Sequence, residues 1–346
     1  MRFKIVLSAI WLIMLSIPVW SQVQAQVKPE SQPIPQQESE QSTASGDAIE
    51  EVLVIGEQPG PGLWKVSKGD HVLWIMGTLK PLPKKMTWHS QQVENILAQA
   101  QEYITPPSVD VHISTMSKIM LVPSLIGIRN NPDGEKLKDI VPADLYARWS
   151  VLKKKYLGNN SSVEKWRPIF AANELYEKAI AQTGLSYDTN VMDVLRAVAK
   201  KNNVQKAGPG TTTEIEKPGK IVSKFKKMPL DDLECFAKTI ERLENDLGSM
   251  RARANAWATG DVETLRKLTY VDHIEVCKSA VLSSALAEEH GLQNIPEQKR
   301  DYWVAEAEAS LAKHESTFSI LPITELMNAD GYLAVLRAKG YEIQEP

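Results

Sequence analysis

Short apolar runs bounded by turn-forming residues lie near both ends of the chain. Val72–Met76 is a continuous apolar run closed by Gly77, and the alternating segment Leu63–Val66 precedes it across the polar residues Ser67–Asp70. This pattern predicts a β-hairpin whose second strand is buried on both faces. Thr317–Leu321, near the C-terminus, is a similar apolar run and predicts another short strand.

The same order of elements follows each of these two strands. A loop, a helix and a further short strand come next in both halves, and the second of these loops is Pro322–Leu326. The spacing predicts a helix over Ser90–Glu102 and a strand over Tyr103–Thr105 in the first half, and a helix over Asp330–Ala338 and a strand over Tyr341–Ile343 in the second.

The loops after the two strands carry the polar side chains of interest. Thr78 and Lys80 follow Gly77 in the first loop, and Thr324 and Glu325 stand in the second. Because glycine adopts backbone angles that a Cβ forbids, we expect Gly77 to allow a sharp exit from its strand. Since α/β proteins place their chemistry at the carboxyl ends of strands, we expect the two loops to form one site.

The middle of the chain has helical periodicity. Helices are predicted over 111–128, 142–156, 163–183, 189–201, 230–259, 262–268, 273–290 and 296–314, with a short strand over 211–215. Asp261 is expected to cap the start of the helix that follows Gly260. The prediction is therefore an α/β fold: a single compact domain over 51–346, with a small central β-sheet built from both chain ends, a mostly helical middle and helices around the sheet.

The N-terminal segment has the composition of a signal peptide. Arg2 and Lys4 precede the apolar run Ile5–Trp20, and cleavage after Ala25 would remove residues 1–25. An uncleaved membrane anchor is the alternative. Residues 26–50 are rich in Gln, Ser, Pro and Glu, which is typical of a flexible linker.

Charge and cysteine content limit the possible partners and compartments. The formal net charge of −3 gives no positive field for nucleic acid, so no nucleic-acid partner is expected. The two cysteines, Cys235 and Cys277, either pair in an oxidising compartment or are buried separately as thiols.

Two long segments resemble the TraB/GumN family, which is related to the Tiki-type metalloproteases. HVLWIMGTLKPLPKKMTWHSQQVENILAQAQEYI is similar to the opening of the family domain, and STFSILPITELMNADGYLAVLRAKGYEI is similar to its close. GLSYDTNVMDVLRAVAKKNNV and NAWATGDVETLRKL add to the resemblance in the middle, so it runs from about Gly62 to the C-terminus. Export to a bacterial periplasm is consistent with both the N-terminal segment and this resemblance.

The family's chemistry rests on two Gly-x-x-His motifs and an acidic residue after the first helix. The first motif reads Gly-Thr-Leu-Lys here and places Lys80 at the histidine position. The second reads Pro-Ile-Thr-Glu and places Glu325 there, with Pro322 instead of the glycine. The acidic position falls near Pro106, where the nearest acids are Glu102 and Asp110. The resemblance therefore implies the family's fold without its metal site, and no cofactor is expected.

Several side chains remain as candidates for chemistry or binding. Opposite charges at Lys80 and Glu325 suggest an ion pair in the vacated site, although both side chains can also point separately to solvent. Arg300 resembles the family's arginine before the last long helix and can bind a carboxylate. The six histidines form no ligand pair at i, i+4, and His71 and His89 flank the first loop. Four tryptophans are expected in or near the core, where a ligand platform is also possible: Trp64, Trp74, Trp88 and Trp303.

Three functions follow from these observations. The first is an exported pseudoenzyme that binds or scaffolds an unknown protein or peptide of the cell envelope. The alternative is a peptidase-like hydrolase that acts through Lys80, Glu325 and Arg300. The third is a structural envelope protein anchored in the inner membrane by an uncleaved N-terminus, the only case in which we expect contact with the membrane.

Overall fold

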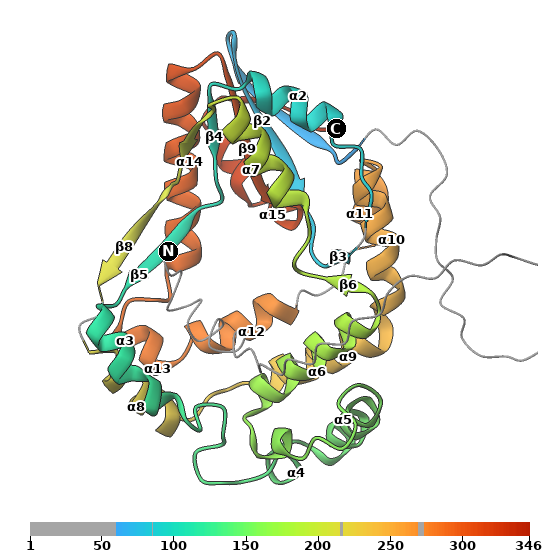
Figure 1. Cartoon of the computed structure of the whole chain (residues 1–346), viewed down its shortest axis with the longest axis vertical. Helices are drawn as coiled ribbons and strands as arrows, with labels where there is room; N and C mark the ends of the chain where they lie inside the picture. The colour runs from blue at the N-terminus through green and yellow to red at the C-terminus, as the bar shows by residue number, and fades with distance from the viewer. Residues whose placement is uncertain (1–59, 85, 215–216, 269–272) are drawn as a thin grey trace, which may run out of the picture.

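The structure of the chain is a computed structural model, in which a six-stranded sheet is flanked by helices (Figure 1). It describes residues 60–84, 86–214, 217–268 and 273–346. The α/β class and the sheet built from both chain ends are confirmed. The expected signal peptide, the linker and the domain start at residue 51 lie outside the described residues.

The sheet joins strands from the beginning and the end of the chain. Its strands are β1 (Leu63–Lys68), β2 (His71–Thr78), β4 (Glu102–Ile104), β7 (Gln205–Ala207), β9 (Ser316–Pro322) and β10 (Glu342–Gln344). Their order is β10-β1-β2-β9-β4-β7. The predicted hairpin is present as the antiparallel pair β1 and β2, and β10 is antiparallel to β1. From β2 to β7 the neighbouring strands are parallel.

The central pair, β2 and β9, places the two ends of the chain side by side. Their parallel register runs from Val72 opposite Ser316 to Thr78 opposite Pro322. Both strands are rich in fully buried apolar side chains, such as Ile75 and Phe318. Continuous apolar character is what a parallel strand covered on both faces requires.

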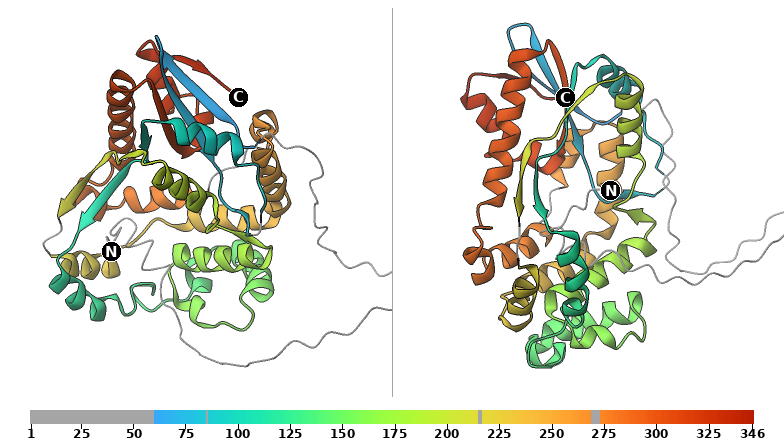
Figure 2. Two further views of the ribbon diagram at one scale, coloured as in Figure 1. Left: turned by 45° about the horizontal axis from the view of Figure 1, so that its top comes forward. Right: turned by 60° about the vertical axis from the view of Figure 1, so that its left-hand side comes forward.

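Helices cover both faces of this sheet (Figure 2). One face carries α14 (Ile295–Lys313), against which α16 (Tyr332–Ala338) packs, and the other carries α2 (Gln91–Gln99) and α7 (Val191–Lys201). α10 (Leu247–Ala258) and α11 (Val262–Lys267) add buried side chains to the same core. In α2, Val93 and Leu97 are fully buried, as expected for apolar residues four positions apart on one helix face.

A second apolar core lies among the helices at the bottom of Figure 1. Its helices are α4 (Leu137–Ile140), α5 (Ala143–Tyr156), α6 (Pro168–Gln182) and α9 (Leu233–Asn245), with the short 3₁₀ helix η2 (Ser162–Lys165). The rings of Trp149 and Phe236 pack at its centre with their centroids 5.1 Å apart. The small antiparallel pair β3 (Leu82–Pro83) and β6 (Leu185–Ser186) connects this part to the segment after β2.

A third apolar core includes the sulfur atoms of both cysteines. It packs α3 (Thr115–Leu121) and the 3₁₀ helix η1 (Val122–Leu125) against α8 (Pro218–Lys227), α12 (His273–Leu282) and α13 (Ala285–Glu289). The parallel pair β5 (Ser108–His112) and β8 (Gly210–Glu214) leads from the main sheet toward this core.

The single helix predicted over 230–259 is wrong, because the chain breaks at Asp246 into α9 and α10. The Asp246 carboxylate contacts an arginine from each helix. Arg242 Nε lies 3.4 Å from it, and Arg253 donates a hydrogen bond to it. These contacts stabilise a turn that helical periodicity alone does not reveal.

Other boundaries also differ from the sequence prediction. The expected loop 322–326 is largely helical, as α15 (Ile323–Met327). The expected helix 111–128 begins in strand β5, and the expected helix 273–290 divides at Ser284, whose hydroxyl caps α13. The predicted Asp261 cap is confirmed, since Asp261 accepts a hydrogen bond from the amide of Thr264.

Candidate functional site

The carboxyl ends of β2 and β9 are adjacent in the sheet. Gly77 pairs with Leu321, and Thr78 pairs with Pro322. The Thr78 hydroxyl donates a 3.1 Å hydrogen bond to the carbonyl oxygen of Leu321, 243 residues away in sequence. Two segments therefore start from neighbouring points where the central strands end. One leads from β2 to Lys80, and the other is α15, which contains Thr324.

Gly77 serves close packing rather than an unusual backbone angle. β2 continues through it to Thr78, and Gly77 is not among the glycines with positive φ, so the expected sharp exit is wrong. A Cβ at this position would lie 2.9 Å from Cγ1 of Ile323 and 3.0 Å from Cζ3 of Trp64. The absence of a side chain thus lets α15 and β1 close over the end of the strand.

A tryptophan that we did not single out from the sequence fixes this strand end. The Trp257 indole nitrogen, on α10, donates a 2.7 Å hydrogen bond to the Gly77 carbonyl oxygen, and both groups are buried. The ring of Trp88 packs at 5.7 Å from that of Trp257. Trp257 stands in the NAWATGDVETLRKL segment of the family resemblance, which was the available signal for it.

The four tryptophans named from sequence occupy two kinds of environment. Trp64 and Trp303 are fully buried, Trp88 is nearly so, and Trp74 is half-buried. The Trp303 indole donates to the Ser319 hydroxyl at 3.1 Å, and this hydroxyl donates to the Ile104 carbonyl. Their contacts are those of core residues in the described part of the chain.

The two charged residues at the matching loop positions differ in exposure. Lys80 is exposed in the segment between β2 and β3, whereas Glu325 is half-buried in the first turn of α15. Among the described residues, Lys80 forms no ion pair at contact distance with Glu325. The suggested pairing in the vacated site is therefore not formed in this structure.

The charges of Arg300 and Glu325 both act on the Tyr332 hydroxyl. Tyr332 is buried and packs edge-on against Trp303 with centroids 5.3 Å apart. Burial and the negative charge of Glu325 together raise the pKa of Tyr332 to about 12, against the opposing positive charge of Arg300. Two of the three predicted site residues therefore act electrostatically on a tyrosine that the sequence analysis missed.

The nearest acids do not supply the family's carboxylate at the strand ends. Glu102 pairs with Thr317 and so lies level with Leu73, at the opposite end of the sheet from Thr78. It accepts a 2.6 Å hydrogen bond from Ser310 on α14. Asp110 belongs to β5, outside the main sheet, and accepts from the Ser108 hydroxyl.

The histidines do not gather around the strand ends. His71 lies at the start of β2, and its Nδ1 is 2.5 Å from the Leu311 carbonyl oxygen. His89 is exposed, and His273 is buried in the helical part, where desolvation lowers its pKa to about 3. Within the described ranges, no group of three or more His, Cys, Asp and Glu side chains could hold a metal ion.

The residues at the strand ends do not fit the metal that the resemblance implies. A protonated lysine has no lone pair to donate and repels a divalent cation. The tyrosine hydroxyl and the guanidinium near Glu325 add no further carboxylate or imidazole.

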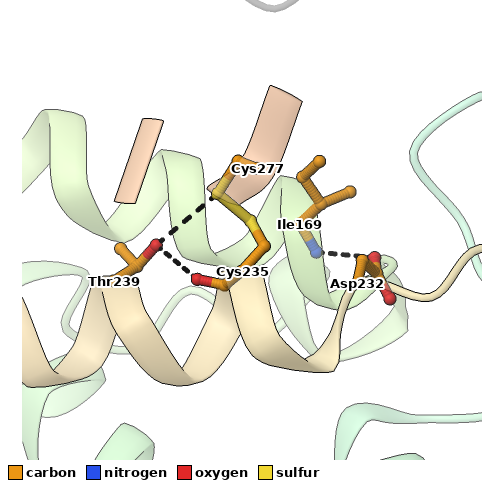
Figure 3. The surroundings of a disulfide bond; sticks show 5 residues. All are labelled: Ile169, Asp232, Cys235, Thr239 and Cys277. Atoms are coloured by element: carbon orange, nitrogen blue, oxygen red, sulfur yellow. Dashed lines mark hydrogen bonds between the residues drawn. A yellow bond between two sulfur atoms is a disulfide. The ribbon is translucent and has the colours of Figure 1, made fainter. Parts of the chain in front are cut away.

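The two cysteines form a disulfide that links α9 to α12 (Figure 3). The Cα atoms of Cys235 and Cys277 are 4.6 Å apart and both residues are buried. Thr239 lies one turn along α9 and donates a 2.8 Å hydrogen bond to the Cys235 carbonyl. Asp232, just before α9, accepts a 2.8 Å hydrogen bond from the Ile169 amide at the start of α6.

Comparison with known proteins agrees with the resemblance seen in the sequence. The model of the TraB/PrgY/gumN family matches residues 62–345, which includes every strand of the main sheet. No curated protein and no solved structure matches the chain. The match spans most of the sequence, and the chain therefore belongs to the TraB/PrgY/gumN family.

Proposed function

We propose that this chain is an exported, non-catalytic member of its family that binds or scaffolds a protein or peptide of the cell envelope. The observation that carries the proposal is the side-chain chemistry where β2 and β9 end together. An exposed ammonium group, a proline and a half-buried carboxylate occupy the places at which the resemblance expects two histidines and a glycine.

The disulfide supports the exported location. Disulfides persist in oxidising compartments such as the bacterial periplasm and are rare in the cytosol. Cys235 and Cys277 are buried within a packed apolar core. The signal-like composition of residues 1–25 points to the same compartment.

Charge at the strand ends supports recognition of a peptide or protein. Lys80 offers a solvated cation, and Arg300 keeps a partly exposed guanidinium that can bind a carboxylate. Since Tyr332 stays protonated at neutral pH, its hydroxyl can donate a hydrogen bond. These groups are suited to an acidic or carboxylate-bearing segment.

Hydrolysis through the same residues is the second candidate, and it is favoured only by the opposed charges of Glu325 and Arg300 that act on the Tyr332 hydroxyl. A lysine acts well as a base when burial disfavours its charged form. Lys80 is exposed, so its surroundings do not provide that burial. This contrast supports the binding function over the hydrolase.

Turnover by matched variants separates the two candidates. Wild type, Lys80→Ala and Glu325→Gln are assayed on peptide and ester substrates, with added zinc or manganese and with chelator. Lys154→Ala, an exposed lysine on α5, is the control. We expect no turnover above the protein-free rate. Turnover that is lost in Lys80→Ala and kept in Lys154→Ala would establish the hydrolase instead.

Capture from envelope extract tests binding directly. We expect Lys80→Glu to lose a partner that both wild type and Lys154→Glu retain, because reversal of the charge repels a carboxylate-bearing segment. Equal capture by all three proteins would contradict the assignment of the binding site to the strand ends.

A further inference from the structure

One short segment carries most of the large apolar side chains that are strongly exposed in the described part of the chain. On α3, Met116, Ile119 and Met120 are 67%, 64% and 73% exposed. They share one helix face, since they are three and four positions apart. Val122 and Ile126, in and just after η1, are 62% and 77% exposed. Clustered exposure of this kind marks an interaction site more often than scattered single residues do.

A lysine-rich helix lies directly beside this segment. α3 and α8 are in contact, and they lie side by side in the views of Figures 1 and 2. The Lys226 ammonium group donates hydrogen bonds to the carbonyl oxygens of Ser124 at 3.3 Å and Ile126 at 2.7 Å. α8 buries Val222 and Phe225 against the third core.

The two neighbouring segments are free of negative charge. Residues 113–129 contain no acidic residue, and residues 217–228 contain five lysines and no acidic residue. We call these two segments together the α3–α8 face. Lys217, Lys220 and Lys227 are exposed, and Lys224 is bridged to Glu289 at 2.6 Å. This face is locally basic although the whole chain has a formal charge of −3.

Buried contacts beneath the α3–α8 face hold its helices in place. The Arg167 guanidinium is buried and donates to the carbonyl oxygens of Phe225 and Met228, at 2.9 Å each, which fixes the end of α8. The same apolar core contains the Cys235–Cys277 disulfide. The exposed apolar side chains are therefore presented by an ordered surface.

We propose that the α3–α8 face docks on an anionic phospholipid bilayer, with the apolar side chains of α3 and η1 entering the interface and the lysines of α8 contacting the headgroups. Apolar residues beside lysines are the combination that interfacial binding to anionic lipid requires. A second copy of the chain would bring the lysines of two α8 helices close together, where they repel each other. A purely apolar partner would offer these lysines no opposite charge. The inference is independent of the proposed function, and none of the described helices has the length and apolar character to cross a bilayer.

A site-specific fluorophore tests this proposal in the full chain. Met120→Cys is labelled with an environment-sensitive dye without reductant, which leaves the Cys235–Cys277 disulfide intact. Val151→Cys on α5 is the matched control, because Val151 is also 70% exposed but lies elsewhere. Vesicles contain either phosphatidylglycerol with phosphatidylcholine or phosphatidylcholine alone. An N-terminal anchor would tether both labelled proteins equally and so does not imitate the signal.

We expect dye emission at residue 120 to rise on the phosphatidylglycerol vesicles, with little change at residue 151. Lys220→Gln with Lys227→Gln, or Met116→Ser with Ile126→Ser, should weaken vesicle binding of the labelled protein on the order of tenfold. Added salt should weaken it as well. Exchange of Lys154 and Lys155 for Gln is the charge control and should have no effect.

Three results would overturn the proposal. The first is no rise at residue 120 on anionic vesicles, or an equal rise at residue 151. The second is an equal rise on phosphatidylcholine alone, which would remove the role of the lysines. The third is a rise without lipid that grows with protein concentration, which would assign the face to a second copy of the chain.

Discussion

The indole nitrogen of Trp257 donates a 2.7 Å hydrogen bond to the carbonyl oxygen of Gly77, across 180 residues of sequence. β1 pairs with β2 only as far as Met76, so this carbonyl lies just beyond the end of that ladder. α10 thus supplies a hydrogen-bond donor to β2 at the position where β1 no longer pairs with it. This contact links the helical middle of the chain to the carboxyl ends of the central strands, where the candidate site lies.

Loss of this donor should destabilise the fold. In Trp257→Phe the Gly77 carbonyl stays buried without the indole donor. We expect the free energy of unfolding to fall by about 1–3 kcal/mol, in addition to the loss from the smaller side chain. Trp149→Phe is the control, because Trp149 is also fully buried but its indole nitrogen has no hydrogen-bond partner in the described structure. Urea denaturation measures both. Equal losses in the two variants would show that the hydrogen bond contributes nothing.

Addition of a methyl group at Gly77 should also be costly. The new Cβ would meet the buried side chains of Ile323 and Trp64 at about 3 Å, and overpacking of this kind costs roughly 1–3 kcal/mol. Gly248→Ala in α10 is the control, since nothing lies within 4 Å of its Cβ position. That change should stabilise the protein by about 0.5–1 kcal/mol through helix propensity. A neutral Gly77→Ala would contradict the close packing of α15 on β2.

The Cys235–Cys277 disulfide should contribute through the loop that it closes. The sequence separation of 42 residues predicts a stabilisation of about 4 kcal/mol from the smaller entropy of the unfolded chain. Thermal or urea unfolding with and without reductant measures this contribution. The double variant Cys235→Ala and Cys277→Ala should be insensitive to reductant. A wild type whose midpoint does not move on full reduction would refute the expected contribution.

Asp232 should make stability depend on pH in an unusual direction. Burial raises the pKa of its carboxyl from 3.8 to about 6, while the Ile169 amide and the positive charge of Arg167 oppose the shift. The folded protein therefore holds a proton that the unfolded chain releases between these two values. The stabilisation from that proton is complete below the unfolded pKa and is lost as pH rises through about 6.

The variant Asp232→Asn isolates this effect. Relative to the variant, the unfolding free energy of wild type should fall by about 1 kcal/mol for each pH unit across that window, and then stay level. Asp133→Asn, at an exposed residue elsewhere in the chain, is the control and should follow wild type. Denaturation curves at a series of pH values provide the measurement. Parallel pH profiles for wild type and Asp232→Asn would rule out a raised pKa.

Local patterns in the sequence correctly predicted many of the elements. The hairpin of β1 and β2 followed from alternation and a polar turn, and amphipathic helices such as α5 and α7 followed from their periodicity. Errors arose where a tertiary contact overrides the local pattern. The break between α9 and α10 depends on Asp246 meeting arginines from both helices, and the helical start of α15 depends on packing over Gly77.

For the candidate site, the sequence named the residues but not their relations. The resemblance identified Lys80, Glu325 and Arg300, and the parallel pairing of β2 with β9 confirms that the two segments are neighbours. The resemblance did not reveal that the charges of Arg300 and Glu325 both act on the Tyr332 hydroxyl, or that Lys80 is exposed. Those facts depend on how the folded chain packs around each side chain.

By itself, the sequence determined the family, the α/β class, and the substitution of lysine and glutamate at the strand ends, because these are properties of residue identity and local order. Only the tertiary structure decided which distant groups touch: Trp257 with Gly77, Cys235 with Cys277, and helix α3 with helix α8. Such contacts join residues far apart along the chain. Their geometry is set by the packing of all three cores together, and no local pattern contains that information.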